Sequence, residues 1–125
     1  MDAFLKEIAD DLVKGRREGR MKEGLRRLYA PDAVFIEAFP EGGVSRKALG
    51  LAAIEARLLW LEAHFETEEA AVDGPFLHWP DRFAVNFAFR RRSDQGAQER
   101  ATRSVAFYTV SDHRIVREEL YSTNH

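Results

Sequence analysis

The sequence predicts an α+β fold in which three helices cover one face of an antiparallel sheet. Helical periodicity is confined to the first 65 residues, whereas almost every later segment alternates apolar and polar residues or is extended, as strands are. The chain is 125 residues long, 45% hydrophobic and 32% charged. These values are typical of one domain, spanning residues 1–125, that buries its own core.

Three segments have the helical period and are predicted to be helices: residues 2–14, 20–29 and 51–65. In the first segment, Phe4, Ile8 and Leu12 recur every four residues and form one apolar stripe. Pro31 ends the second helix, because proline lacks the backbone N–H that a continuing helix needs. The third segment has its own stripe, with Trp60 beside it.

The rest of the chain reads as strands and turns. Strands are predicted at residues 33–39, 66–78, 83–90, 100–110 and 115–122, with turns at 40–43 and 79–82, a polar loop at 93–98, and either a short strand or an irregular lead-in at 44–50. The strongest period-2 signal comes from Phe83, Val85, Phe87 and Phe89. Gly74-Pro75 predicts a bulge or bend in its strand.

A two-residue turn at Asp112 and His113 predicts how the last two strands pair, with Phe107 opposite Glu118. Matching the apolar faces then places Phe83 beside Phe107. The covered face is predicted to carry Phe83, Val85, Phe87, Phe89, Val105, Phe107, Val116 and Leu120, together with the charged residues Arg103 and Glu118. The other face is predicted to carry Ala84, Asn86, Ala88, Ser104, Ala106, Tyr108, Arg117, Glu119 and Tyr121. That mixture suits either solvent or a second copy of the chain.

Composition excludes several classes of protein. The chain has no cysteine, and its four histidines lack chelating spacing, so we expect neither a disulfide, a metal site nor a bound cofactor. A net charge of −2 argues against a nucleic-acid partner, and no apolar run is long enough to cross a membrane. The N-terminus has no signal-peptide pattern, so a cytoplasmic location is expected. The run Arg90-Arg91-Arg92 is interpreted as a solvated strand end.

Several local motifs resemble one family in their order and spacing. They are LYAPDAV at 28–34, AIEA at 53–56, GPF at 74–76, DRFAV at 81–85, YTV at 108–110 and IVREE at 115–119. On these segments the chain resembles the SnoaL-like branch of the nuclear transport factor 2-like superfamily, from about Leu28 to Ser122. The last motif follows Asp112-His113-Arg114, where members usually have Asp-Gly-Lys.

The resemblance implies a cone-shaped fold: a curved antiparallel sheet wrapped around N-terminal helices, with an apolar cavity inside and a homodimeric assembly. The superfamily includes ketosteroid isomerases, polyketide cyclases, dehydratases, epoxide hydrolases and non-catalytic binding proteins, so the fold alone does not identify a reaction. The isomerase pattern of one Tyr and two Asp residues has no counterpart here. Glu118-Glu119 stands where the acid–His pair of the cyclases would be sought.

Three residues are candidate proton carriers: Glu118, Glu37 and His78. Glu118 is the strongest, because alternation places it on the covered face, where burial would raise its pKa; the alternative is a structural carboxylate. Glu37 is either a cavity acid or an edge residue facing water, and His78 is either a proton carrier or structural. Candidate ligand-binding residues are Arg103, Trp60, Phe83, Phe87 and Phe107. Arg103 could hold an anionic group, or it could lie at the rim of the cone.

We therefore expect a homodimeric protein that binds a small apolar or weakly anionic molecule. Glu118 would act as base, with Arg103 as electrostatic support, in a cofactor-free isomerisation, cyclisation or dehydration. The alternative is a non-catalytic ligand-binding or dimeric assembly module, so the sequence leaves open whether the chain is an enzyme.

Overall fold

The computed structural model describes residues 4–38, 46–93 and 99–123. The predicted turn at 40–43 and residues 94–98 of the predicted loop lie outside these ranges. Within them the helices are α1 (Leu5–Arg17), α2 (Met21–Leu28) and α3 (Leu51–His64). The strands are β1 (Tyr29–Ala38), β2 (Arg46–Leu49), β3 (Phe65–His78), β4 (Arg82–Ser93), β5 (Glu99–Ser111) and β6 (Arg114–Thr123).

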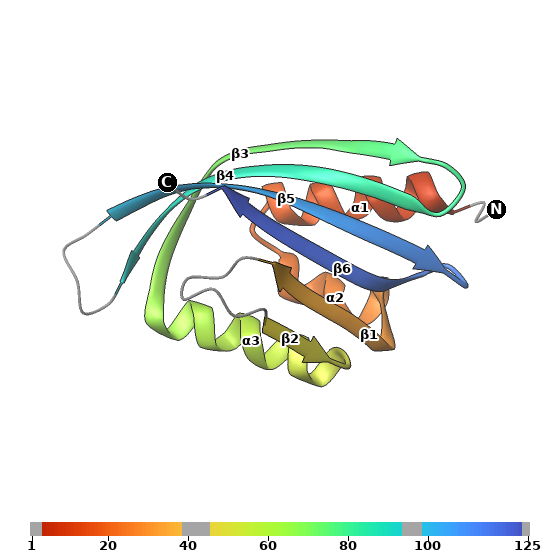
Figure 1. The fold of residues 1–125 in the computed structure, drawn as a ribbon, viewed down its shortest axis with the longest axis horizontal. Coiled ribbons are helices and arrows are strands. Elements are labelled where there is room, and N and C mark those ends of the chain that lie inside the picture. The colour runs from red at the N-terminus through yellow and green to blue at the C-terminus, as the bar shows by residue number, and fades with distance from the viewer. Residues whose placement is uncertain (1–3, 39–45, 94–98, 124–125) are drawn as a thin grey trace.

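The strands form one curved sheet in the order β2-β1-β6-β5-β4-β3 (Figure 1). Neighbouring strands are antiparallel, except that β1 runs parallel to β6. The sheet is therefore mixed, whereas the sequence predicted antiparallel pairing throughout. β1 and β6 come from opposite ends of the chain, so no hairpin turn forces them to be antiparallel.

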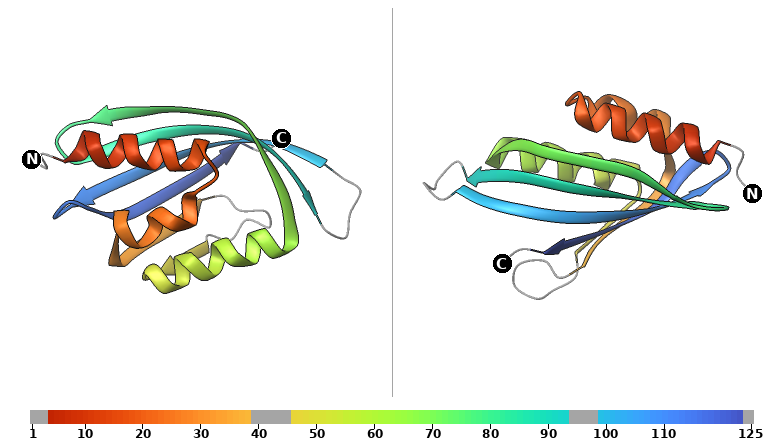
Figure 2. Two further views of the ribbon diagram at one scale, coloured as in Figure 1. Left: turned by 180° about the vertical axis from the view of Figure 1, so that it is seen from behind. Right: turned by 90° about the horizontal axis from the view of Figure 1, so that it is seen from above.

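The helices all lie on the concave side of the sheet (Figure 2), which confirms the predicted α+β class. α1 packs against β3 and β4, and α3 packs against β1 and β2. Ile8 and Leu12 of the predicted stripe are buried and meet the alternating aromatic side of β4, whereas Phe4 precedes α1 and is 43% exposed. The centre of this core is Leu5, Ile8, Leu12, Val13, Phe83, Val85 and Phe87.

α2 ends one residue before the predicted helix end, and β1 begins four residues before the predicted strand. α2 ends at Leu28, and β1 begins at once with Tyr29. The pairing of β1 with β6 is irregular between Tyr29 and Val34, a stretch that contains Pro31, which cannot donate a ladder hydrogen bond. The segment whose structure the sequence left open, 44–50, contributes the short strand β2.

The predicted bend at Gly74-Pro75 is confirmed as a register shift between Asp73 and Phe76. Gly74 has a φ of 132°, and a Cβ there would lie 3.1 Å from the carbonyl oxygen of Ala84. A side chain at this position would therefore be strained and would crowd the backbone of β4.

The β5–β6 hairpin turns at Asp112 and His113 as predicted, with φ values of 51° and 65°. Both residues thus adopt the left-handed conformation without a glycine. Beyond the turn, however, the pairing shifts by one residue: Val110 pairs with Ile115, but Thr109 pairs with Arg117. Val116 is the extra residue of a β-bulge.

The bulge shows that the predicted strand register was wrong. Glu118 lies opposite Tyr108 instead of Phe107, and Phe83 also pairs with Tyr108. A slip of one residue reverses the two faces of a strand. β5 therefore turns Ser104, Ala106 and Tyr108 toward the helices, and Arg103, Val105 and Phe107 face outward. The prediction failed because β5 carries apolar residues on both faces, so its alternation does not identify the buried one.

The corrected register makes a direct prediction for Ala106, which is fully buried on the helix side of β5. We expect Ala106→Arg to lower the free energy of unfolding by at least about 3 kcal/mol, because it forces an unpaired charge into the core. Urea unfolding followed by circular dichroism measures the loss. The matched control is Ala101→Arg on the same strand, since Ala101 is exposed. Equal stability of the two variants would contradict the register.

Candidate functional site

Glu118 lies on the concave side of the sheet and is the centre of the candidate site. It belongs to β6, between β1 and β5, and is only 6% exposed. The hydroxyl of Tyr29 donates a hydrogen bond to Glu118 Oε1. The strand neighbours of Glu118 are Phe35 on β1 and Tyr108 on β5. Three aromatic residues therefore flank one carboxyl group.

Burial raises the pKa of Glu118 above its ordinary value, because desolvation penalises the carboxylate. The Tyr29 hydrogen bond and the positive charges of Arg57 and Arg16 lower this pKa, but burial outweighs them. Burial also raises the pKa values of Tyr29 and Tyr108 well above that of an ordinary tyrosine. Both tyrosines are therefore protonated hydrogen-bond donors at neutral pH.

Tyr108 carries an unsatisfied polar group beside Glu118. Within the described part of the chain, its hydroxyl is buried without a hydrogen-bond partner. Its ring stacks on Phe83, with centroids 4.7 Å apart and an interplanar angle of 13°. A buried hydroxyl without a partner costs about 1–3 kcal/mol. The Tyr108 hydroxyl is therefore still available as a hydrogen-bond donor on the side of the sheet that carries Glu118.

Two arginines reach the same region from the helices, and each has a carboxylate partner. Arg57 of α3 lies 3.1 Å from Glu37 and 4.1 Å above the ring of Phe35. Arg16 of α1 lies 2.6 Å from Glu69 and 4.1 Å above the ring of Phe87. Each guanidinium is thus held between an acid and an aromatic face, which fixes its position.

The concave side contains a hollow of about 1910 Å³. Residues from all three helices and all six strands of the described chain line it. Among the predicted site residues, the hollow is lined by Glu118, Glu37, Trp60 and Phe87. Its lining is more charged than the apolar cavity expected from the sequence, because arginines and glutamates alternate with the aromatic rings.

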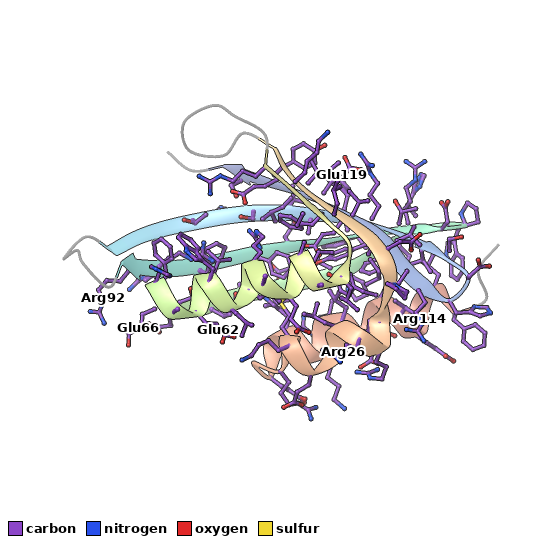
Figure 3. The ribbon with its side chains drawn as sticks, turned by 90° about the horizontal axis from the view of Figure 1, so that it is seen from below. Arg26, Glu62, Glu66, Arg92, Arg114 and Glu119 are labelled. Carbon is purple, nitrogen blue, oxygen red and sulfur yellow. The ribbon has the colours of Figure 1, made fainter. Side chains whose placement is uncertain are left out.

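Ion pairs occur along one edge of this hollow. Figure 3 shows Glu62 and Glu66 following one another from the end of α3 into β3, with Arg92 beyond them. Glu62 pairs with Lys22 at 3.0 Å, and Glu66 pairs with Arg92. In the same view Glu119 lies on the other side of the sheet from α3. The side chains of Glu118 and Glu119 therefore lie on opposite faces of the sheet.

The remaining predicted site residues do not line the hollow. Arg103 and Phe107 face the opposite side of the sheet, because the register of β5 differs from the predicted one. His78 is exposed at the end of β3, and Phe83 is buried in the core under α1. Arg103 is therefore not the electrostatic support of Glu118; Arg16 and Arg57 exert that effect.

Five residues of the site were not predicted from the sequence: Tyr29, Tyr108, Arg16, Arg57 and Arg91. Tyr29 falls at the end of the helix predicted over residues 20–29, and Tyr108 is predicted on the outer face of the sheet. Arg91 had been grouped with two solvated arginines, although alternation along β4 continues inward from Phe87 and Phe89 to Arg91. Continuing the alternation of β4 two residues beyond Phe89 would have predicted that Arg91 faces inward.

The described ranges contain no helix that is long and apolar enough to cross a membrane. They also contain no group of three or more His, Cys, Asp or Glu side chains placed to hold a metal ion.

A sequence profile of the SnoaL-like domain matches residues 9–118, which is most of the chain. The chain belongs to the SnoaL-like domain family. This confirms the family that the local motifs of the sequence resemble. No curated protein matches the sequence of this SnoaL-like domain.

Solved structures share its fold. A candidate SnoaL-like polyketide cyclase from Mesorhizobium loti is 24% identical, with 93% of this chain and 97% of that chain covered and a TM-score of 0.82. A nuclear-transport-factor-2-like protein of unknown function from Burkholderia pseudomallei is 18% identical, with 95% and 90% covered and a TM-score of 0.74. TerC, co-crystallised with polyporic acid, is 25% identical, with 86% and 82% covered and a TM-score of 0.66. The cone-shaped fold is therefore shown.

The raised pKa of Glu118 predicts a pH-dependent stability. Between the ordinary glutamate value of 4.5 and the raised value, the folded protein keeps a proton that the unfolded chain releases, so stability falls as pH rises. Glu118→Gln removes this fall, and its amide oxygen can still accept the Tyr29 hydrogen bond. Above the raised value we expect the variant to be more stable than the wild type by on the order of 1 kcal/mol.

Urea unfolding over a pH series measures this difference, which should shrink as the pH approaches 4.5. The matched control is Glu119→Gln. The hydrogen bond from Arg117 lowers the pKa of Glu119. Glu119→Gln should therefore not raise the free energy of unfolding at high pH. A pH-independent difference between wild type and Glu118→Gln would contradict the raised pKa.

Proposed function

We propose that this SnoaL-like domain binds a small organic molecule in the hollow and that Glu118 transfers a proton of that molecule. The observation that carries the proposal is a glutamate that is buried, has a raised pKa and still lines the hollow. A general base is most effective when its pKa lies near the working pH. Among candidate proton carriers, Glu37 is already paired with Arg57, and His78 lies away from the hollow.

The reaction class that fits is proton transfer at a carbon next to a carbonyl group. The Glu118 carboxylate takes the proton, and the electron pair of the broken C–H bond becomes an enolate. Arg57 and Arg16, whose charges act on Glu118, stabilise that negative charge. Return of the proton from Glu118 to another carbon gives isomerisation. Dehydration results if the enolate expels a neighbouring hydroxide, which takes the proton from Glu118 and leaves as water. Cyclisation results if the enolate attacks a second carbonyl and the alkoxide formed takes the proton back from Glu118. Each route balances without an electron acceptor.

The relatives support uptake of a small molecule without identifying it. TerC, the 25% identical relative, was co-crystallised with polyporic acid, and the relative from Mesorhizobium loti is named after polyketide cyclases. The alternative function is a non-catalytic ligand-binding or assembly module, in which Glu118 only satisfies the Tyr29 hydroxyl.

Solvent deuterium exchange separates catalysis from binding. We expect the wild type to accelerate exchange of the acidic C–H bonds of 2-tetralone, a bicyclic ketone, in D₂O followed by NMR. Glu118→Gln should lower this acceleration at least about a hundredfold, the scale of a lost general base. The variant should still broaden the ligand resonances, because the hollow is unchanged.

The matched control is Glu119→Gln, which removes a carboxylate from the adjacent position on the opposite face and should leave exchange unchanged. Ligand broadening without any acceleration in the wild type would favour the non-catalytic alternative. Acceleration that survives Glu118→Gln would remove Glu118 from the mechanism.

We also propose that the outer face of the sheet pairs two copies of the chain. A row of apolar side chains crosses β3, β4 and β5 there: Phe76, Ala84 and Phe107, which are register neighbours. Phe76 and Phe107 are 53% and 45% exposed, and Phe107 contacts Tyr121 edge-on, with ring centroids 5.6 Å apart. Exposed aromatic residues of this kind are typical of interface centres.

The dimer predicts that Phe107→Arg yields monomers, because two arginines would meet at the centre of a twofold interface. Sedimentation velocity measures the change in mass. Lys47→Arg is the control, since Lys47 is exposed on β2 at the other end of the sheet. A wild type that sediments as a monomer, or a Phe107→Arg variant that remains dimeric, would contradict the proposed surface.

A further inference from the structure

Arg91 is a third arginine of the hollow and differs from the other two in its partners. It lies on the inner side of β4, one step of the alternation beyond Phe89, and is partly buried. Its Nε donates a hydrogen bond to Thr67 Oγ1 at 3.2 Å. Its guanidinium lies 4.7 Å from the ring centre of Phe89 and 5.6 Å from that of Phe65. Two aromatic rings and one hydroxyl thus hold it in place.

No carboxylate of the described residues lies within ion-pair distance of Arg91, whereas Arg16 has Glu69 and Arg57 has Glu37. A guanidinium has five N–H donors, and one hydroxyl accepts one of them. Partial burial of a charge without a counter-ion is unfavourable unless another group supplies the opposite charge. An anion bound beside Arg91 would therefore stabilise this partly buried charge.

The surrounding charges strengthen that effect. Burial and the positive charges of Arg57 and Arg16 lower the pKa of Arg91, and Glu37 and Glu69 offset them only in part. The three guanidinium groups thus act on one another across the hollow. An anion arriving there interacts favourably with all three, and with Arg91 most directly, because its donors are not already used by an acid.

We propose that Arg91 binds the acidic group of an elongated organic acid whose apolar body lies along Phe89 and Phe87 toward Glu118. This inference rests on the proposed function, that the hollow takes up a small molecule, and names the class of that molecule. Arg91 and Phe87 are four residue steps apart on β4, about 13 Å of strand. A two-ring aromatic acid has that length, and a guanidinium can hold a carboxylate with two parallel hydrogen bonds.

The test compares two isosteric probes, biphenyl-4-carboxylate and biphenyl-4-carboxamide, which differ in charge but hardly in shape. Isothermal titration calorimetry at pH 8 should give the carboxylate at least tenfold tighter binding to the wild type. Arg91→Gln should weaken carboxylate binding about tenfold or more and change carboxamide binding less than twofold, because a charge-assisted hydrogen bond is lost only for the carboxylate.

The matched control is Arg90→Gln, which removes the neighbouring arginine on the exposed side of the same strand and should leave both affinities unchanged. Arg91→Lys keeps the charge but loses the two-pronged geometry, so we expect an intermediate carboxylate affinity. This second variant keeps the test decisive if Arg91→Gln unfolds.

Three results would overturn the inference. Equal binding of the two probes to the wild type would show that the hollow takes up a ligand without selecting an anion, and the proposed function would stand. A carboxylate preference that survives in Arg91→Gln would place the anion on another residue. Failure of the wild type to bind either probe would count against both the inference and uptake of small aromatic molecules.

Discussion

The β-bulge at Val116 is the constraint on which the site depends. β6 is a central strand, and one extra residue there decides which of its side chains face the helices. With the bulge, Glu118 is opposite Tyr108, and the aromatic ring next to it across β5 is Phe83. The irregular start of β1 lies beside the same stretch of β6 and brings the Tyr29 hydroxyl to the carboxyl group. Two irregularities of strand pairing, the bulge in β6 and the irregular start of β1, therefore position the groups around Glu118.

Glu118 is held between two opposing electrostatic effects. Burial favours the neutral acid, whereas Tyr29, Arg57 and Arg16 favour the carboxylate. Since each arginine is anchored by its own acid and ring, these positive charges do not need to move when Glu118 changes its protonation state. A site with fixed dipoles and charges stabilises a developing anion without reorganisation. The arrangement therefore suits a group that both accepts and returns a proton.

The sequence predicted the burial of Ile8 and Leu12 on α1, the buried side of β4 and the burial of Glu118, because each rests on a period in which one face is clearly apolar. The same reasoning failed on β5, where Val105 and Phe107 compete with Ala106 and Tyr108 for the core. No local pattern reveals a bulge on the partner strand, so register had to come from the three-dimensional pairing. The role of Arg57 could not be predicted for another reason. Its partners Glu37 and Phe35 belong to β1, which contacts α3 only in the folded chain.

The tightly packed core and the hollow lie in different halves of the concave side. α1 buries Leu5, Ile8, Leu12 and Val13 against the sheet, so this half is packed and tolerates little change. α3 buries Ile54 but leaves Leu59 and Trp60 about half exposed, and the hollow lies along it. Substitutions along α3 therefore alter the lining of the hollow at small cost in folding energy, while the sheet keeps Glu118 in place. A fold divided in this way can keep one buried acid while the residues that line the hollow change.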